Sequence, residues 1–318
     1  MKVIKDIIIA FNFISALVGA GLASGKEIVV FMGNANYFSV ALCGIMIGCF
    51  AFPFILLGIR SEGNTLSVLF KDNQWVGNII IRIMNFIFLG AMLGGAESLL
   101  YEISGIKYGG FIIAIITLIC CELGENFTRL LNAFSVPLIL IALLVLFHYK
   151  HPPINGEISI YKPLLYACMN TSCAGIYASK FCSGLKNKDA FIICSIIAVV
   201  LSTLFIIARR LTVGVEDYEI PIYSVSIDTN FRLFGALIIL ISILTSCISS
   251  LKLCSHNSNM SSYSTCFFAL IFSFVGFSNI IKYVYPTLGF IGISLLFLTV
   301  YRASSPRLKN CKKWNLYL

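Results

Sequence analysis

Polar residues that could do chemistry interrupt the apolar runs of this sequence at four places. Residues 18–27 read Val-Gly-Ala-Gly-Leu-Ala-Ser-Gly-Lys-Glu, so a charged pair follows three closely spaced glycines. Glu97 stands in a second apolar run, residues 170–172 read Asn-Thr-Ser in a third, and Thr245 precedes Ser246 in a fourth. In an apolar environment a carboxylate can hold a cation or a proton, and hydroxyl and carbonyl oxygens can ligate small cations.

The elements that carry these residues belong in a lipid bilayer. Of the 318 residues, 58% are apolar and 12% are charged, whereas about a quarter are charged in soluble domains. A helix needs about 20 apolar residues to cross the hydrocarbon core. The sequence therefore predicts an all-α, polytopic membrane protein. We expect about ten membrane-spanning helices, at residues 4–33, 37–59, 76–101, 108–122, 126–148, 159–184, 189–208, 231–254, 262–279 and 281–301.

The Lys and Arg residues predict the orientation of the chain. With the N-terminus inside, about fifteen of them fall at or near the cytoplasm and about seven on the other side, which is the bias of cytoplasmic loops. We therefore expect a multi-pass protein of the cell membrane with both termini cytoplasmic, a basic tail at 302–318 and the loop around 213–230 outside. Topology and an anionic inner leaflet explain the formal net charge of +9, so nucleic acid binding is not expected.

The ten apolar runs form two halves in which successive runs have the same spacing. The midpoints of runs five places apart differ by about 151 to 156 residues throughout, which indicates an internal repeat of five helices at 1–148 and 149–301. Because five is an odd number, the second half must be inverted in the membrane. Inverted repeats are typical of alternating-access transporters, whose substrate site lies near the midplane between the halves.

The glycine-rich segment 19–25 and the polar segment 170–175 lie at corresponding places in the two halves, and we expect non-helical backbone at both. N–H groups at the first break suit a carboxylate, and oxygens of the second suit an ammonium group. Close helix packing is the alternative explanation for the glycines. The predicted substrate-binding residues are Gly19, Ala20, Gly21, Ala23, Ser24, Gly25, Asn170, Thr171 and Ser172.

Three charged residues are candidates for coupling to an ion or proton. Because a charge in lipid is costly, Glu97 should face the bundle interior, where it could pair with Lys26 or carry the coupling proton. Lys26 and Glu27 also stand near the outer end of their helix. The alternative to a coupling role is therefore that both side chains reach the membrane surface.

Segment 18–27 resembles the Val-Gly-Ala-Gly-Phe-Ala-Ser-Gly-Gln-Glu signature of the YkvI-like bacterial membrane proteins, an amino-acid permease family. This chain departs from the signature at Leu22, where the family has Phe, and at Lys26, where it has Gln. The family belongs with the amino acid–polyamine–organocation superfamily. The resemblance therefore implies the LeuT-type fold, a five-plus-five inverted repeat.

The resemblance also implies a possible sodium site. LeuT-type sodium symporters use Thr and Ser hydroxyls of the eighth helix together with carbonyls of the first break, and Thr245 and Ser246 match that pattern. A hydroxyl in a membrane helix can instead bond to its own backbone or to a neighbouring helix. Both explanations stay open at this point.

The sequence as a whole predicts a secondary active transporter of a small amino acid or related amine, driven by a proton or sodium gradient through alternating access. A ligand-sensing receptor of the same fold, such as a germination-type nutrient sensor, is the alternative, and a scaffold without ligand is the third. No catalytic motif accompanies the three His residues, and the twelve Cys residues form no C-x-x-C pair. We expect neither an enzyme nor a cofactor other than Na⁺ or H⁺.

Overall fold

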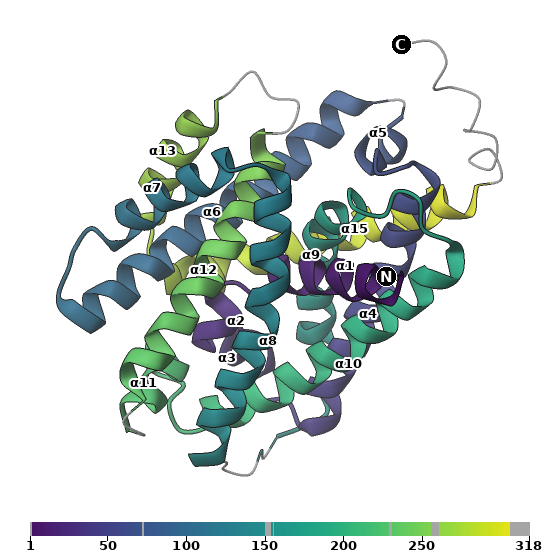
Figure 1. The fold of residues 1–318 in the computed structure, drawn as a ribbon. Coiled ribbons are helices and arrows are strands. Elements are labelled where there is room, and N and C mark those ends of the chain that lie inside the picture. Colours follow the sequence, from purple (N-terminus) through teal and green to yellow (C-terminus); the bar gives the residue numbers. More distant parts are fainter. Residues whose placement is uncertain are drawn as a thin grey trace.

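The computed structural model describes residues 2–71, 73–149, 154, 156–228, 231–255 and 261–305, and their regular structure is helical. Figure 1 shows the arrangement of these helices. The first run forms α1 (Lys2–Leu17), α2 (Ala20–Ser24) and α3 (Lys26–Met32), and the others of its half form α4 (Tyr37–Arg60), α6 (Gln74–Ser104), α7 (Gly109–Glu122) and α8 (Glu125–Tyr149). The second half forms α9 (Tyr161–Ser179), α10 (Asn187–Thr212), α12 (Arg232–Ser255), α13 (Ser262–Ser273) and α15 (Tyr285–Ser304). All ten predicted runs are thus found as helices.

Four of the five pairs of helices that stand five runs apart pack against each other. The contacting pairs are α1 with α9, α4 with α10, α6 with α12 and α7 with α13. Other contacts also occur in both halves. The first helix of each half contacts the second helix of the other half, in the pairs α1 with α10 and α9 with α4. The first helix of each half also contacts the last helix of its own half, in the pairs α1 with α8 and α9 with α15. Short helices α5 (Thr65–Leu69) and α11 (Pro221–Asp228) occupy the corresponding loops of the two halves. The predicted five-plus-five repeat is therefore confirmed, while its boundaries at 148 and 149 stay a prediction and tail residues 306–318 lie outside the described residues.

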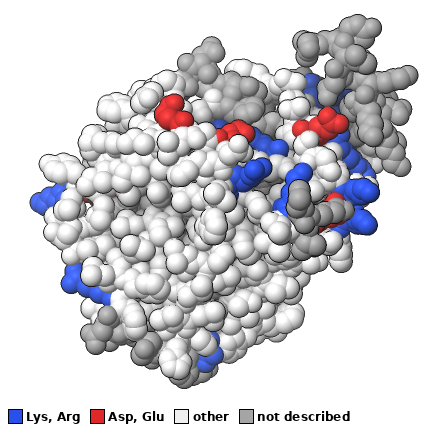
Figure 2. Space-filling model, viewed as in Figure 1, with Lys and Arg blue, Asp and Glu red and all other residues white. Residues whose placement is uncertain are grey.

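The surface agrees with burial in a membrane. Six helices in the described part of the chain are long and apolar enough to cross a bilayer by length and composition, whereas α7 and α13 are shorter. Figure 2 shows a broad area of one face without charged side chains, with charged residues along its margins. In Figure 1, α7 and α13 lie at one side of the molecule, away from α4 and α10.

The first helix breaks where the glycines predicted it. Gly19 has extended backbone between α1 and α2, and Gly25 separates α2 from α3 with a φ of 86°. That left-handed conformation favours glycine, because a Cβ atom would clash with the backbone there. Gly21 is required for a different reason: a Cβ atom on it would collide with the carboxyl group of Glu27. Gly25 therefore lets the chain turn between α2 and α3, and Gly21 leaves room for Glu27 to fold back against α2.

The second expected break is absent, and that prediction was wrong. Helix α9 runs without interruption through 170–175. The Asn170 side chain donates to the carbonyl oxygen of Tyr166 at 3.1 Å, and Ser172 donates to that of Cys168 at 2.8 Å. Because these polar groups bond to carbonyls one turn earlier on their own helix, they do not require the backbone to unwind.

The irregular segment of the second half lies in the tenth run instead. Helix α13 ends at Ser273, short of the predicted end at 279, and the chain turns at Gly276 with a φ of 95°. Helix α14 (Phe277–Asn279) then leads into a π-helical segment, Ile280–Val284, before α15 begins. Such segments often accompany functional sites, and this one directly precedes Tyr285.

Candidate functional site

Glu27 is a buried carboxyl group beside the broken helix. Only 2% of the residue is exposed, and the Tyr166 hydroxyl donates a hydrogen bond of 2.7 Å to its Oε2 atom. Among the described residues it has no ion-pair partner. A buried carboxyl group is costly unless it is paired or protonated, so this arrangement suits a mobile cation or proton.

The surroundings of Glu27 are aromatic and contain a tyrosine hydroxyl without a partner among the described residues. The Tyr166 ring packs on Phe31 and Phe205, with centroids 5.3 and 5.7 Å apart. Tyr285 is fully buried, lies within electrostatic reach of Glu27, and packs 5.0 Å from the Phe88 ring. Within the described part of the chain, the Tyr285 hydroxyl has no hydrogen-bond partner. The buried hydroxyl of Thr171, five residues after Tyr166 on α9, also has none among the described residues. Unpaired buried polar groups call for a ligand, a water or a movement that satisfies them.

Hydroxyl groups of α12 meet the carbonyl groups freed by the first break. Ser242 donates to the Val18 oxygen at 2.6 Å and also lies 3.3 Å from the Gly19 oxygen. Ser246 donates to the Ser15 oxygen at 3.3 Å. Thr245 bonds to its own helix at the Ser242 oxygen, 3.1 Å away. Side-chain and carbonyl oxygens of α1 and α12 therefore gather at one place, as hard cations require.

A narrow cavity lies between α1, α6, α9 and α12. Its volume is about 10 Å³, which is room for roughly one water molecule. The polar side chains that line it come from α6, α9 and α12: Asn85, Asn170, Ser249 and Ser250. An amino acid cannot enter it unless the helices separate.

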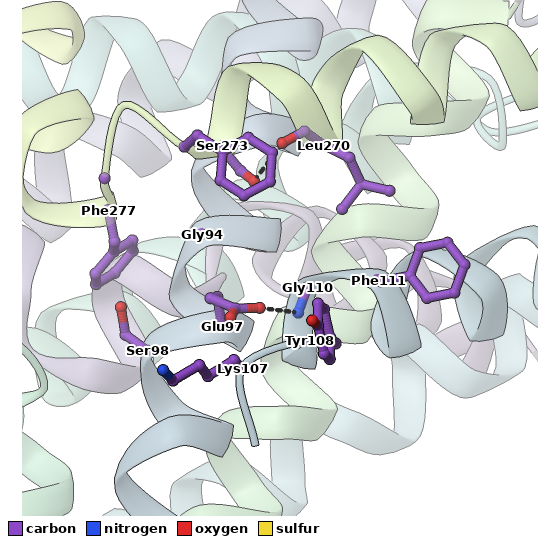
Figure 3. Close-up of a pocket in the computed structure, with 12 residues that line it drawn as sticks. Gly94, Glu97, Ser98, Lys107, Tyr108, Gly110, Phe111, Leu270, Ser273 and Phe277 are labelled. Atoms are coloured by element: carbon purple, nitrogen blue, oxygen red, sulfur yellow. Dashed lines mark hydrogen bonds between the residues drawn. The ribbon is translucent and has the colours of Figure 1, made fainter. Parts of the chain in front are cut away.

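The predicted position of Glu97 was wrong. Its Oε2 atom accepts a hydrogen bond of 2.9 Å from the backbone N–H of Gly110, at the start of α7. The residue is half-buried and lines a peripheral cavity (Figure 3), not the space around the first break. It does not pair with Lys26, whose ammonium group donates to the carbonyl oxygens of Tyr218 at 2.8 Å and Glu216 at 3.4 Å. Lys26 thus reaches the loop between α10 and α11, while Glu27 turns inward.

The remaining predicted residues fall into two groups. Gly19, Gly21, Ala23, Ser24 and Gly25 belong to the break, with Ser24 donating to the Gly21 oxygen at 3.2 Å, and Ala20 begins α2. Asn170, Thr171 and Ser172 are buried on the continuous helix α9. Sequence reasoning missed Tyr166, Tyr285, Ser15 and Ser242, whereas Val18 belongs to the segment that it singled out. A signal existed only for Ser242, which stands one helical turn before Ser246.

Comparisons with known proteins agree with this architecture. No protein-family model matches the chain. It is 25% identical, over 324 aligned residues, to the uncharacterized membrane protein YkvI of Bacillus subtilis (strain 168), covering 91% of this chain and 93% of that protein. Its structure is similar to that of Mhp1, a nucleobase-cation-symport-1 family transporter in a closed conformation with bromovinylhydantoin bound. The TM-score is 0.57 at 9% identity, over 93% of this chain and 74% of that one. The chain has the LeuT-type fold. Membership of the amino acid–polyamine–organocation superfamily stays a prediction.

Proposed function

We propose that this protein is a secondary active transporter of a small amino acid or related amine, coupled to a proton or sodium gradient. The observation that carries the proposal is Glu27: a buried carboxyl group without an ion-pair partner among the described residues, beside the broken helix of an inverted repeat. The likeness to a transporter of the same fold supports it. Inverted-repeat transporters bind their substrates at such breaks.

Glu27 reverses the sign of the charge that the first break was expected to bind. The first break was expected to hold the carboxylate of a substrate, but the protein's own carboxyl group lies against Gly21 there. A second carboxylate beside it would be repelled, whereas an ammonium group would be attracted. In our proposal Glu27 therefore binds the substrate amine or the coupling proton, and the unpaired hydroxyls of Thr171 and Tyr285 are further hydrogen-bonding groups for the substrate.

The oxygen cluster between α1 and α12 is the proposed place for a sodium ion. Carbonyl oxygens of Ser15 and Val18 and side chains of Ser242 and Ser246 would supply ligands, with Thr245 one position before Ser246 on the same helix. These groups hydrogen-bond to one another in the structure. A bound cation would replace those bonds and hold α1 against α12.

Alternating access requires two layers of contacts to open in turn. On one side of the site, Ser15 and Ser135 hydroxyls lie 2.9 Å apart, and Asn132 donates to Tyr177 and Ser249 at 3.1 Å each. These bonds connect α1, α8, α9 and α12. On the other side, the ring contacts of Tyr166 with Phe31 and Phe205 connect α3, α9 and α10. Separation of one layer while the other stays closed would expose Glu27 to one side at a time.

Uptake into proteoliposomes tests this proposal. Labelled amino acids and amines are screened with the purified full chain, with proton and sodium gradients imposed separately. The proposal expects gradient-dependent uptake of at least one compound with an amine group. Binding of a compound without uptake under either gradient would contradict transport and favour the receptor.

A further inference from the structure

A second cavity, whose lining does not include Glu27, lies between α6, α7 and the segment that joins α13 to α14. Figure 3 shows Glu97, Lys107, Tyr108 and Ser98 around it, with Phe111, Leu270 and Phe277 as apolar parts of its wall. Its volume is about 270 Å³. That is slightly below the roughly 300–1,000 Å³ of pockets for drug-sized ligands, so it suits a small group.

Two opposite charges at this cavity are not paired with each other. Glu97 accepts one hydrogen bond, from the Gly110 N–H, and makes no ion pair among the described residues. Lys107 has no hydrogen bond or ion pair to any described residue. A ligand with an ammonium group at one end and an anionic group at the other would satisfy both charges.

The length of α6 predicts that the cavity lies at the edge of the hydrocarbon core, next to the lipid headgroups. Helix α6 has 31 residues and is therefore about 46 Å long, against a hydrocarbon core of about 30 Å. If α6 is centred in the bilayer, about 8 Å of the helix extends beyond each boundary of the hydrocarbon core. Glu97 lies only about 10 Å from the end of the helix at Ser104, and therefore close to that boundary. Tyr108, which is 74% exposed, and Lys107 are residue types typical of that interface.

We propose that this cavity binds the headgroup of phosphatidylethanolamine. The ethanolamine ammonium would donate to the Glu97 carboxylate and the phosphate would accept from Lys107, while an acyl chain lies along the exposed apolar side chains of Phe111 and Phe274. Phosphatidylcholine lacks the N–H donors that a carboxylate requires. An anionic headgroup would place a negative charge beside Glu97 without an ammonium group to compensate it. The inference is independent of whether the protein transports anything.

Native mass spectrometry of the purified full chain tests this proposal, with an equimolar mixture of phosphatidylethanolamine, phosphatidylcholine and phosphatidylglycerol. We expect selective retention of phosphatidylethanolamine, roughly tenfold weaker in Glu97→Gln and in Lys107→Gln, the effect of losing one charged hydrogen bond. Lys107→Gln leaves the Glu97–Gly110 bond intact, so it tests the site even if Glu97→Gln fails to fold. Glu219→Gln and Lys162→Gln, charge-matched changes outside this cavity, should retain the lipid as the wild type does.

Equal retention of the three lipids, or unchanged selectivity in folded Lys107→Gln, would overturn the proposal. A free zwitterion is the other source of the same chemistry. Calorimetry with phosphoethanolamine and with alanine, on protein in phosphatidylcholine nanodiscs, distinguishes the two sources. Saturable binding of either solute that depends on Lys107, without lipid selectivity, would assign the cavity to a soluble ligand instead.

Discussion

Glu27 and Glu97 are both carboxyl groups in glycine-containing apolar runs, yet the structure gives them opposite surroundings. Glu27 is 2% exposed and bonds to a tyrosine hydroxyl between the two halves of the repeat. Glu97 is half-buried near the end of a long helix and bonds to a backbone N–H of α7. The comparison shows that distance from a helix end does not by itself place a charge in the centre of a bundle. A break that turns the chain inward does.

Substitution of Gly21, which makes room for Glu27, should produce the largest effect on substrate uptake. A Cβ atom at Gly21 would collide with the Glu27 carboxyl group, whereas one at Gly94, beside the Glu97 cavity, would meet its nearest atom at an ordinary 3.4 Å. We expect Gly21→Ala to lower substrate uptake roughly 10- to 100-fold, because small misplacements of a binding group have effects of that size. Gly94→Ala is the matched control and should keep uptake within about twofold. Equal effects of the two changes would show that Glu27 is not specially placed.

Removal of hydroxyls from the α12 cluster should produce a smaller effect that depends on sodium. If sodium is the coupling ion, Ser242→Ala and Ser246→Ala should raise the sodium concentration for half-maximal uptake about tenfold, the size of effect seen when groups around a bound metal are lost. Ser195→Ala, which removes an exposed hydroxyl bonded to its own helix at Phe191, should change nothing. An unaltered sodium dependence in both cluster variants would remove the sodium site from the account.

Glu97→Gln should affect stability more than transport. The change weakens the bond to the Gly110 N–H at the start of α7, an interaction of the helix-capping kind that contributes about 1 kcal/mol. We expect the midpoint of thermal unfolding to fall by a few degrees, while uptake stays within about twofold. Static light scattering during heating, or a thiol-reactive dye, measures the midpoint. A large loss of uptake at unchanged stability would return Glu97 to the coupling role first predicted for it.

Chain orientation can be tested without altering either site. We expect a cysteine that replaces Glu216, the residue whose carbonyl accepts from Lys26, to be labelled from outside in a Cys-depleted background. A cysteine at Glu62, in the turn after α4, should be labelled only from the cytoplasm. The reverse pattern would invert the predicted topology.

The sequence was sufficient for the helices, the repeat and the first break, because apolar runs and glycine clusters act locally. It failed where tertiary contacts decide. Asn170 and Ser172 bond back to their own helix, so α9 continues. Glu97 bonds to the N–H of Gly110 on α7, a contact that α6 alone does not indicate. Tyr166 and Tyr285 could not be singled out, because aromatic residues are common in membrane helices and only packing shows which of them reach Glu27.

The most direct test is to compare Glu27→Gln with Glu97→Gln, using the substrate found by the proteoliposome screen. Both variants are reconstituted at equal density beside Glu122→Gln, a change at an exposed carboxylate, and initial rates are measured under the coupling gradient. Loss of the charged partner of a buried ligand typically costs about 2–5 kcal/mol, so Glu27→Gln should lower uptake at least about 30-fold, with the other two near wild type. Wild-type uptake by folded Glu27→Gln would contradict the account.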